Sequence, residues 1–353
     1  MIKILIHGAT DFNSSNFGDY LYVDGTIRRI KASRSDALIK IAKPSEYFLQ
    51  HLPAFKQADF SNKDADLLIY APGGYFGEGH SYRFRDILIH FWRFMPVGLA
   101  AVNRHQRILI VGVGAGPIKS RILRWSIKRI CSHSEGVYVR DEESRNALTE
   151  LGIKDVKLSF DPILVLPLSE WYKEFDISKL THKTNEILLV HYNHSMHAME
   201  LFAKAVRDYV TQRKSDVTVI VSSDQLLDYE DRLYEQFCFI SKVESIHYQY
   251  SDPYEFISLI RQCNKILTCK LHVGVVGHML GASVICVAEH PEKSHRYYDR
   301  QGCPERCLSL YDVDYEETLS AMNSLFDASM PKFSEDILQL SESAWCAMDK
   351  SLE

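Results

Sequence analysis

The sequence lacks the features that mark membrane-spanning and metal-stabilised proteins. No stretch approaches the roughly 18 uncharged apolar residues that a membrane-spanning helix needs. The eight cysteines form no CxxC pair, and the two closest, Cys303 and Cys307, have neither the spacing nor the second pair of a zinc site. We therefore expect reduced, buried thiols in a cytoplasmic protein.

Motifs for nucleotides and nucleic acids are also missing. The P-loop pattern GxxxxGK[ST] does not occur, and the glycines of 112–116 lack the spacing and the following acid of a dinucleotide-binding fingerprint. No nucleic-acid-binding motif is present, so we expect no nucleic-acid partner. The N-terminal MIKILIHGAT has one lysine beside a short apolar run, which predicts a first β-strand and not a secretory signal.

Acidic residues are scarce in one long segment, although the net charge is −5. Between Ser81 and Arg129 the chain has ten Lys or Arg residues and a single acid, Asp86. Arginines here are mixed with Phe, Trp, Leu and Ile, a composition that can lie at an anionic membrane surface. This interpretation predicts peripheral contact of residues 81–129 with the inner face of a membrane. The alternative is an ordinary half-buried helix whose arginines extend into solvent.

Apolar runs alternate with helical patterns along the chain, which is typical of parallel sheets covered by helices on both faces. In the first half the runs end in Gly, Asp or Pro, as buried parallel strands do, and they lie at 2–8, 66–74, 107–116, 136–141 and 156–162. In the second half they lie at 186–192, 217–223, 245–250, 265–269 and 282–288. Because 353 residues exceed one typical core, we predict an α/β fold with two Rossmann-like domains facing across a cleft.

The alternation fails between Leu164 and Asn185, where Pro, Ser and Thr occur without a clean period. We therefore predict an N-terminal domain at 1–165, a linker at 166–185, a C-terminal domain at 186–330 and a final helix at 331–353. In the C-terminal domain, SDPYEF is a strong helix start, with Asp252 as the N-cap and Pro253 in the first turn.

The carboxyl ends of the strands are where ligands bind in such sheets. Glycine-rich loops at these ends let backbone N–H groups approach an anion or a sugar closely, although tight packing explains glycine equally well. The candidates are Asn16, Gly18 and Asp19 after the first strand, Gly73 and Gly74 after the second, and Gly112, Gly114 and Gly116 after the third.

Arg140 lies where the strand at 136–141 ends and a helix begins. Its planar guanidinium suits a carboxylate or a phosphate. A salt bridge to Asp141 or Asp161 is an equally good interpretation.

Lys270 and His272 stand at the start of another helix, where the helix dipole adds partial positive charge. Together with Arg140 they favour a small anion that carries both a carboxylate and a phosphate. Such an anion would keep the imidazole protonated and able to act as a general acid. The alternatives are a histidine packed between the domains and a lysine that faces solvent.

His191, His194 and His197 follow the first strand of the second half. Their spacing of three could support a metal, but no carboxylate is placed to complete the site. We favour polar contacts from this group to a substrate and predict no metal site.

In order along the chain, the motifs NFGDYL, PGGYFG, GVGAGPI, VYVRDEES, FDPIL and KLHVGVVGHMLGASVICV resemble the polysaccharide pyruvyl transferase family. The resemblance runs from the N-terminus to about residue 290 and implies a GT-B-like fold. It also implies transfer of the pyruvyl group of phosphoenolpyruvate onto a hexose of a bacterial-type surface polysaccharide or its lipid-linked precursor, with formation of a pyruvate ketal. No cofactor is implied, since phosphoenolpyruvate is the donor substrate.

The resemblance also assigns roles to residues. The family's arginine before a helix acid matches Arg140, and its Arg-x-His element falls on Lys270 and His272, with lysine in place of the usual arginine. His272 would be the general acid, Arg140 and Lys270 would hold the donor, and Asp19 would accept a hydroxyl proton. The N-terminal domain would be the acceptor side and the C-terminal domain the donor side.

Two other functions fit the same pattern. A sugar-nucleotide-dependent GT-B glycosyltransferase has a similar helix, glycine and strand near its nucleotide, but often with a glutamate where this chain has His278. A non-catalytic carbohydrate-binding relative is the second alternative, because of the lysine at 270 and the histidine group at 191–197.

Overall fold

The computed structural model of the protein describes residues 1–11, 16–52, 55–78, 83–171, 173, 186–193, 195–213, 217–224 and 229–353. These residues form two compact units, of which the first comprises Met1–Leu166 with Ser334–Glu353 and the second comprises Pro167–Phe333. The first unit therefore includes the C-terminal helix that the sequence predicted at 331–353. Most of the predicted linker at 166–185 lies outside the described residues.

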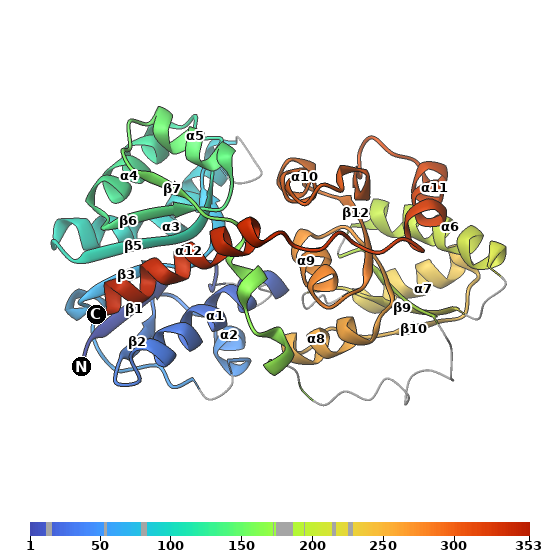
Figure 1. The fold of residues 1–353 in the computed structure, drawn as a ribbon, viewed down its shortest axis with the longest axis horizontal. Coiled ribbons are helices and arrows are strands. Elements are labelled where there is room, and N and C mark those ends of the chain that lie inside the picture. Colours follow the sequence, from blue (N-terminus) through green and yellow to red (C-terminus); the bar gives the residue numbers. More distant parts are fainter. Residues whose placement is uncertain are drawn as a thin grey trace. The chain divides into compact units, whose positions relative to one another are not determined.

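The first unit contains a parallel sheet with the strand order β2-β1-β3-β5-β6-β7, and β4 pairs with β5 (Figure 1). Every one of these pairs is parallel. The strands are β1 (Lys3–His7), β2 (Leu38–Ile41), β3 (Leu67–Tyr70), β4 (Gly73–Phe76), β5 (Arg107–Ala115), β6 (Gly136–Val139) and β7 (Val156–Leu158). The central strand β5 is buried from Ile108 to Ala115, because helices cover both faces of the sheet.

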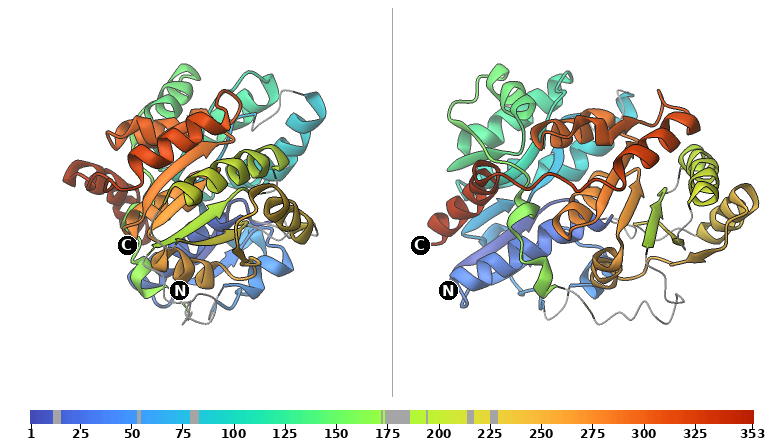
Figure 2. Two further views of the ribbon diagram at one scale, coloured as in Figure 1. Left: turned by 90° about the vertical axis from the view of Figure 1, so that its right-hand side faces the viewer. Right: turned by 45° about the vertical axis from the view of Figure 1, so that its right-hand side comes forward.

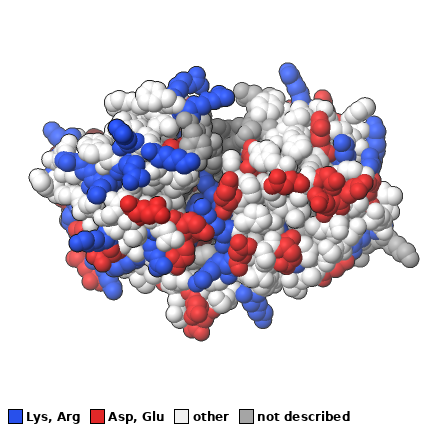
Figure 3. Space-filling view, turned by 90° about the horizontal axis from the view of Figure 1, so that it is seen from above, with Lys and Arg blue, Asp and Glu red and all other residues white. Residues whose placement is uncertain are grey.

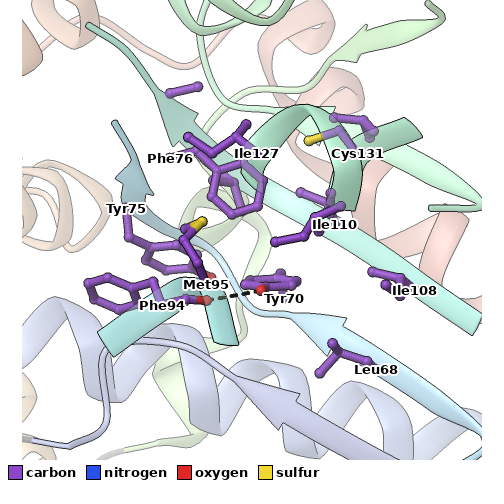
Figure 4. Close-up of a cluster of buried hydrophobic side chains, with 14 of the residues drawn as sticks. Leu68, Tyr70, Tyr75, Phe76, Phe94, Met95, Ile108, Ile110, Ile127 and Cys131 are labelled. Carbon is purple, nitrogen blue, oxygen red and sulfur yellow. Dashed lines mark hydrogen bonds between the residues drawn. The ribbon is translucent and has the colours of Figure 1, made fainter. Parts of the chain in front are cut away.

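One face of this sheet is covered by α3 (Phe84–Asn103) and α4 (Arg121–His133). Figure 4 shows the core between the helices and the strands, in which Met95 and Ile127 meet Tyr70 and Ile110. The Tyr70 hydroxyl donates to the carbonyl of Phe94 at 3.0 Å, so the buried phenol has its hydrogen bond.

The other face is covered by α1 (Phe17–Ser33) and α12 (Glu335–Leu352), which lies beside the sheet of the first unit in Figure 1. Trp345 of α12 is buried there, and its indole N–H donates to the carbonyl of Pro162 at 3.0 Å. At the surface, the Arg29 guanidinium of α1 binds Asp349 and Glu342 of α12. Two shorter α-helices, α2 (Glu46–Gln50) and α5 (Glu142–Glu150), also belong to this unit.

The second unit has a parallel sheet with the order β10-β9-β8-β11-β12-β13. Its strands are β8 (Glu186–His191), β9 (Val217–Ser222), β10 (Ser245–His247), β11 (Lys265–Thr268), β12 (Ser283–Ala288) and β13 (Cys307–Ser309). Its helices are α6 (Met196–Gln212), α7 (Glu230–Ser241), α8 (Pro253–Gln262), α9 (Leu271–Met279), α10 (Pro291–Arg300) and α11 (Tyr315–Leu325), and they lie on both faces of the sheet (Figure 2). The helices α6, α7 and α11 share one hydrophobic core with the strands.

The predicted start of α8 is confirmed. Asp252 is the N-cap of α8, since its carboxylate accepts from the N–H groups of Tyr254 and Glu255, and Pro253 opens the helix. The segment predicted as one strand at 66–74 is divided into β3 and β4, which both pair with β5 in parallel and are separated by Ala71 and Pro72. The structure adds the strands β2 and β13 and the helices α10 and α11, which the sequence patterns did not reveal.

None of the helices in the described part of the chain has the length and apolar character needed to cross a membrane.

Candidate functional site

The loop after β1 leads into α1 through Asn16, Gly18 and Asp19. The side-chain oxygen of Asn16 accepts from the backbone N–H of Asp19 at 3.3 Å, so Asn16 is the N-cap of α1. Gly18 is buried, and the half-buried Asp19 lies in the first turn, where the helix dipole stabilises a carboxylate. Asn16 therefore has a structural role that the sequence did not assign to it.

The glycines predicted to follow strands lie mostly within them, with Gly73 and Gly74 in β4 and Gly112 and Gly114 in β5, and most of them serve packing. Gly112 has a φ of +59°, and a Cβ there would lie 2.4 Å from the side chain of Pro162. A Cβ at Gly116 would lie 3.0 Å from Ala147. Gly73 is buried, whereas its neighbour Gly74 is exposed. Of the glycines named here, Gly74 is the exposed one.

Gly114 lies directly against the guanidinium of Arg140. A Cβ at Gly114 would come within 2.8 Å of Arg140 Nε, so only glycine leaves room for this side chain. Arg140 is 8% exposed, and its Nε lies 3.7 Å from the Asp141 carboxylate. The salt bridge predicted as one of two alternatives for Arg140 is therefore present within the first unit.

Tyr22 and Asp161 complete the surroundings of Arg140, and the sequence did not single out Tyr22. The Tyr22 hydroxyl donates to the Asp161 carboxylate at 3.0 Å, and both side chains are buried. Burial and the nearby Asp161 raise the pKa of Tyr22 far above its ordinary value, so the phenol stays neutral. Burial opposes the charge of Arg140, but Tyr22, Asp141 and Asp161 raise the pKa of its guanidinium above the ordinary value.

A second polar group near the end of β1 was also missed. His7, the last residue of β1, is buried, and its Nε2 lies 3.1 Å from the Phe94 carbonyl. Burial lowers the pKa of His7 to about 4, so the ring is neutral at neutral pH. Close in sequence, the Asp11 carboxylate binds Arg93 Nε at 2.5 Å. The signal in the sequence was the polar run HGATD directly after the first strand.

In the second unit, the carboxyl ends of three neighbouring strands bring His191, Asp224 and Thr268 together. His191 is opposite Thr268 in the register of β8 and β11, and β9 is on the other side of β8. His191 Nδ1 lies 2.9 Å from Thr268 Oγ1, and His191 Nε2 lies 3.5 Å from Asp224 Oδ1. His191 and Asp224 are almost fully buried, so this pair is an internal part of the unit.

Polar contacts connect this group to the start of α9. Burial would raise the pKa of Asp224, but His191, Lys270 and His272 hold the pKa below its ordinary value, so the carboxylate is ionised and only accepts. Thr268 Oγ1, which contacts His191 Nδ1, accepts from the backbone N–H of Lys270 at 3.0 Å. A chain of polar contacts thus runs from the buried Asp224 to the start of α9.

Lys270 is the N-cap residue of α9, and His272 is the second residue of that helix, as predicted. Both side chains are partly exposed. The Lys270 ammonium lies 3.9 Å from the carboxylate of Glu289, which follows β12. Lys270 and His272 contribute to the lowered pKa of the buried Asp224. This end of the sheet therefore carries an ammonium and an imidazole at the positive end of a helix.

The other histidines have different surroundings. His197 Nε2 lies 3.2 Å from the Leu310 carbonyl, and His194 lies outside the described residues. Within the described ranges, no group of three or more His, Cys, Asp or Glu residues could hold a metal ion. His278 lies 3.0 Å from the Tyr297 hydroxyl and 2.6 Å from the Pro331 carbonyl, and its ring stacks on Phe333. His278 is therefore a packing residue.

The family of the chain follows from its sequence match. The family model described as polysaccharide pyruvyl transferase matches residues 16–291, which is most of the 353-residue chain. The chain belongs to the polysaccharide pyruvyl transferase family. The predicted family is thereby confirmed, and the matched region includes Arg140, Lys270 and His272. No protein with a curated description matches the sequence.

Solved structures of similar fold cover nearly the whole chain. A structure from Listeria monocytogenes, described as a UDP-N-acetylglucosamine 2-epimerase, has a TM-score of 0.69 and 11% identity, and covers 100% of this chain and 97% of its own. The UDP-GlcNAc 2-epimerase of Neisseria meningitidis bound to UDP-GlcNAc has a TM-score of 0.63 and 12% identity. It covers 100% of this chain and 99% of its own. That of Methanocaldococcus jannaschii has a TM-score of 0.65 and 12% identity over 99% of both chains. At these identities the likeness concerns the fold alone, and it confirms the predicted GT-B-like class with two Rossmann-like domains.

Proposed function

We propose that the protein transfers the pyruvyl group of phosphoenolpyruvate onto a hexose of a surface polysaccharide or its lipid-linked precursor, forming a pyruvate ketal. Membership in the polysaccharide pyruvyl transferase family supports a transferase of this kind. The single observation that carries the proposal is the pair Lys270 and His272 at the positive end of α9. Phosphoenolpyruvate has a carboxylate and a phosphate, and the positive charge at the start of α9 is complementary to both.

The reaction balances without a cofactor. The methylene carbon of phosphoenolpyruvate takes a proton, and a sugar hydroxyl forms a C–O bond to the resulting oxocarbenium-like carbon. The C–O bond to phosphate then breaks, a second hydroxyl closes the ketal, and inorganic phosphate leaves with a proton. Two hydroxyl protons are thus released and two protons are taken up, one by the methylene carbon and one by phosphate.

The residues of the second unit receive the donor-side roles. Lys270 and the backbone N–H groups at the start of α9 would hold the anion. We assign to His272, as imidazolium, the delivery of one of the two protons. In the first unit, Asp19 is the proposed acceptor of a hydroxyl proton, and the exposed Gly74 is a candidate for contact with the sugar. The remaining substrate contacts assigned from the sequence, Arg140 among them, stay predictions.

Thermal unfolding in the presence of ligands tests whether phosphoenolpyruvate is the donor, and it does not require the acceptor to be known. A ligand at a hundred times its Kd stabilises the folded state by about 2.7 kcal/mol, which moves the Tm by several degrees. We expect phosphoenolpyruvate to raise the Tm of the wild-type protein and to lose this effect in Lys270→Gln. Lys204→Gln is the matched control, because Lys204 is an exposed lysine of α6 in the same unit.

UDP-GlcNAc and UDP serve as competing ligands in the same experiment. A Tm shift with UDP and none with phosphoenolpyruvate would refute the proposal in favour of a sugar-nucleotide enzyme. No shift with either ligand, combined with no phosphate release from phosphoenolpyruvate in the presence of glycans, would favour a non-catalytic carbohydrate-binding protein.

A further inference from the structure

Helices α3 and α4 present an unusual combination of exposed aromatic and basic side chains. Trp92 is 65% exposed, Ile89 is 53% exposed and Trp125 is 55% exposed, although side chains of this size are normally buried. Exposed cations surround them on both helices. We name as the α3–α4 surface the residues Arg85, Ile89, Trp92, Arg121, Arg124, Trp125 and Lys128.

These residues share one outward side of the first unit. On α3, the core is filled by positions such as Phe91, Met95 and Gly98, and Ile89 and Trp92 are turned away from it. On α4, the buried Leu123 and Ile127 are likewise opposite the exposed cations. Both helices cover the same face of the sheet and contribute to one core. Their outward sides therefore form one continuous surface.

The α3–α4 surface carries an excess of positive charge. The helix α4 contains Arg121, Arg124, Lys128 and Arg129 and no acid. Among the described residues, no acidic side chain forms a salt bridge with any of these four; Arg124 instead binds the Ile118 carbonyl and Arg129 binds the Asn103 amide oxygen. The Arg129 guanidinium also lies over the Trp125 ring, 6.0 Å from its centroid. In Figure 3, Lys and Arg side chains gather at the upper left, and Asp and Glu side chains lie below them.

Lys43 adds one more cation beside Trp92. Its ammonium donates to the carbonyl of Trp92 at 3.1 Å, and the side chain is exposed. Asp86, the acid in the first turn of α3, is 33% exposed and pairs with Arg85 at 3.7 Å. The surface thus keeps a strong positive excess around two indole rings.

We propose that the α3–α4 surface binds the headgroup region of an anionic lipid bilayer. Lys and Arg are attracted by anionic headgroups within about a Debye length of the surface. Tryptophan has its preferred position at the boundary between headgroups and acyl chains, because its ring is apolar and its N–H is polar. Nucleic acid would satisfy the cations, but it leaves the exposed Ile89 without an apolar partner.

The four tryptophans provide an internal reporter. Trp92 and Trp125 are exposed, whereas Trp171 and Trp345 are almost fully buried. Adding vesicles of equal parts phosphatidylglycerol and phosphatidylcholine should shift the fluorescence maximum to shorter wavelength, and lipids brominated on the acyl chain should quench it. Trp92→Phe/Trp125→Phe removes both exposed indoles, so it should abolish the shift. Binding should be at least tenfold weaker in 0.5 M salt and with vesicles of phosphatidylcholine alone.

Charge variants test the surface without using its tryptophans. We expect Arg124→Glu/Lys128→Glu to reduce co-sedimentation with the phosphatidylglycerol vesicles at least tenfold while the Tm stays within a few degrees. The matched control is Arg232→Glu/Phe239→Ser, since α7 also exposes a cation and a large aromatic ring. This control should sediment like the wild-type protein.

Several outcomes would overturn the proposal. One is that Arg124→Glu/Lys128→Glu binds the vesicles as well as the wild-type protein does. Another is that the α7 control loses as much vesicle binding as this charge variant. A third is that the wild-type protein does not co-sediment with the vesicles at low salt. Binding to single-stranded RNA or duplex DNA in the absence of vesicle binding would assign the surface to a nucleic acid instead. Because the vesicles contain no phosphoenolpyruvate and no sugar, failure here leaves the proposed transfer reaction untouched.

Discussion

The imidazole of His191 is held 3.5 Å from the carboxylate of Asp224, and both side chains are shielded from solvent. A buried carboxylate is stable only with a partner that offsets its desolvation. His191 is that partner, and through Thr268 it is connected to the backbone of Lys270. The pair therefore supports the start of α9, where the donor is proposed to bind.

Asp224→Asn should destabilise the protein in a pH-dependent way. The pKa of Asp224 is lowered in the folded state, so its ionisation stabilises the fold above the unfolded pKa of about 4. That contribution is lost as the pH falls through the folded pKa. We expect Asp224→Asn to lower the free energy of unfolding by about 1–3 kcal/mol at pH 7, with a smaller difference below pH 4, as measured by urea unfolding.

The control for this change is Asp208→Asn. Asp208 also has a lowered pKa, but it pairs with Arg207 at the solvent-exposed surface. Exposed ion pairs contribute little, so Asp208→Asn should change the stability only slightly. If both substitutions changed the free energy of unfolding equally, the contact between Asp224 and His191 would not stabilise the fold.

His272→Ala should lower kcat roughly 10²-fold or more, the scale of a lost general acid. The side chain is partly exposed, so the Tm should change little. Phosphate release with phosphoenolpyruvate and a glycan acceptor is the measurement. His295→Ala on α10 is the control and should keep the wild-type rate. An unchanged rate in His272→Ala would remove this residue from the mechanism.

Lys270→Arg should preserve or tighten the binding of phosphoenolpyruvate. Arginine keeps the positive charge and adds a planar pair of donors suited to carboxylate and phosphate. Isothermal titration of both proteins with phosphoenolpyruvate gives the two Kd values. Weaker binding by at least tenfold would indicate that the lysine has another partner, for which Glu289 is the nearest candidate.

Gly114→Ala should destabilise the first unit by about 1–3 kcal/mol. The added Cβ would lie 2.8 Å from Arg140 Nε, so the guanidinium has to move. In an Arg140→Ala background this clash is gone, and the cost of Gly114→Ala should fall by about 1 kcal/mol or more. Gly8→Ala is the control, because its Cβ would meet nothing closer than 3.5 Å. Additive effects of Gly114→Ala and Arg140→Ala would show that the two residues do not share this contact.

The sequence predicted the strands best where both faces are buried. A run such as Ile108–Ala115 contains no charge, so it identifies β5 directly. The strand β2 at Leu38–Ile41 escaped notice because it is short, lies at the edge of the sheet and includes Lys40. The strand β13 has three residues, too few to show any period.

The candidate site could be predicted only in part. Lys270 and His272 could be predicted as candidate ligand-binding residues because a strand, a polar turn and a helix follow each other directly in the chain. Asp224 could not be assigned as the partner of His191, because their contact depends on β9 being a neighbour of β8. That strand order is set by long-range packing and not by the residues next to Asp224. Tyr22 was missed for a similar reason, since its partner Asp161 is distant in the sequence.

The helix α12 has a consequence for the biosynthesis of the protein. Its residues Ala344, Trp345, Met348 and Leu352 belong to the same core as β1. The second unit lies between β1 and α12 in the chain, so a ribosome makes these residues after the whole of that unit. Until then, this face of the first sheet lacks part of its apolar cover.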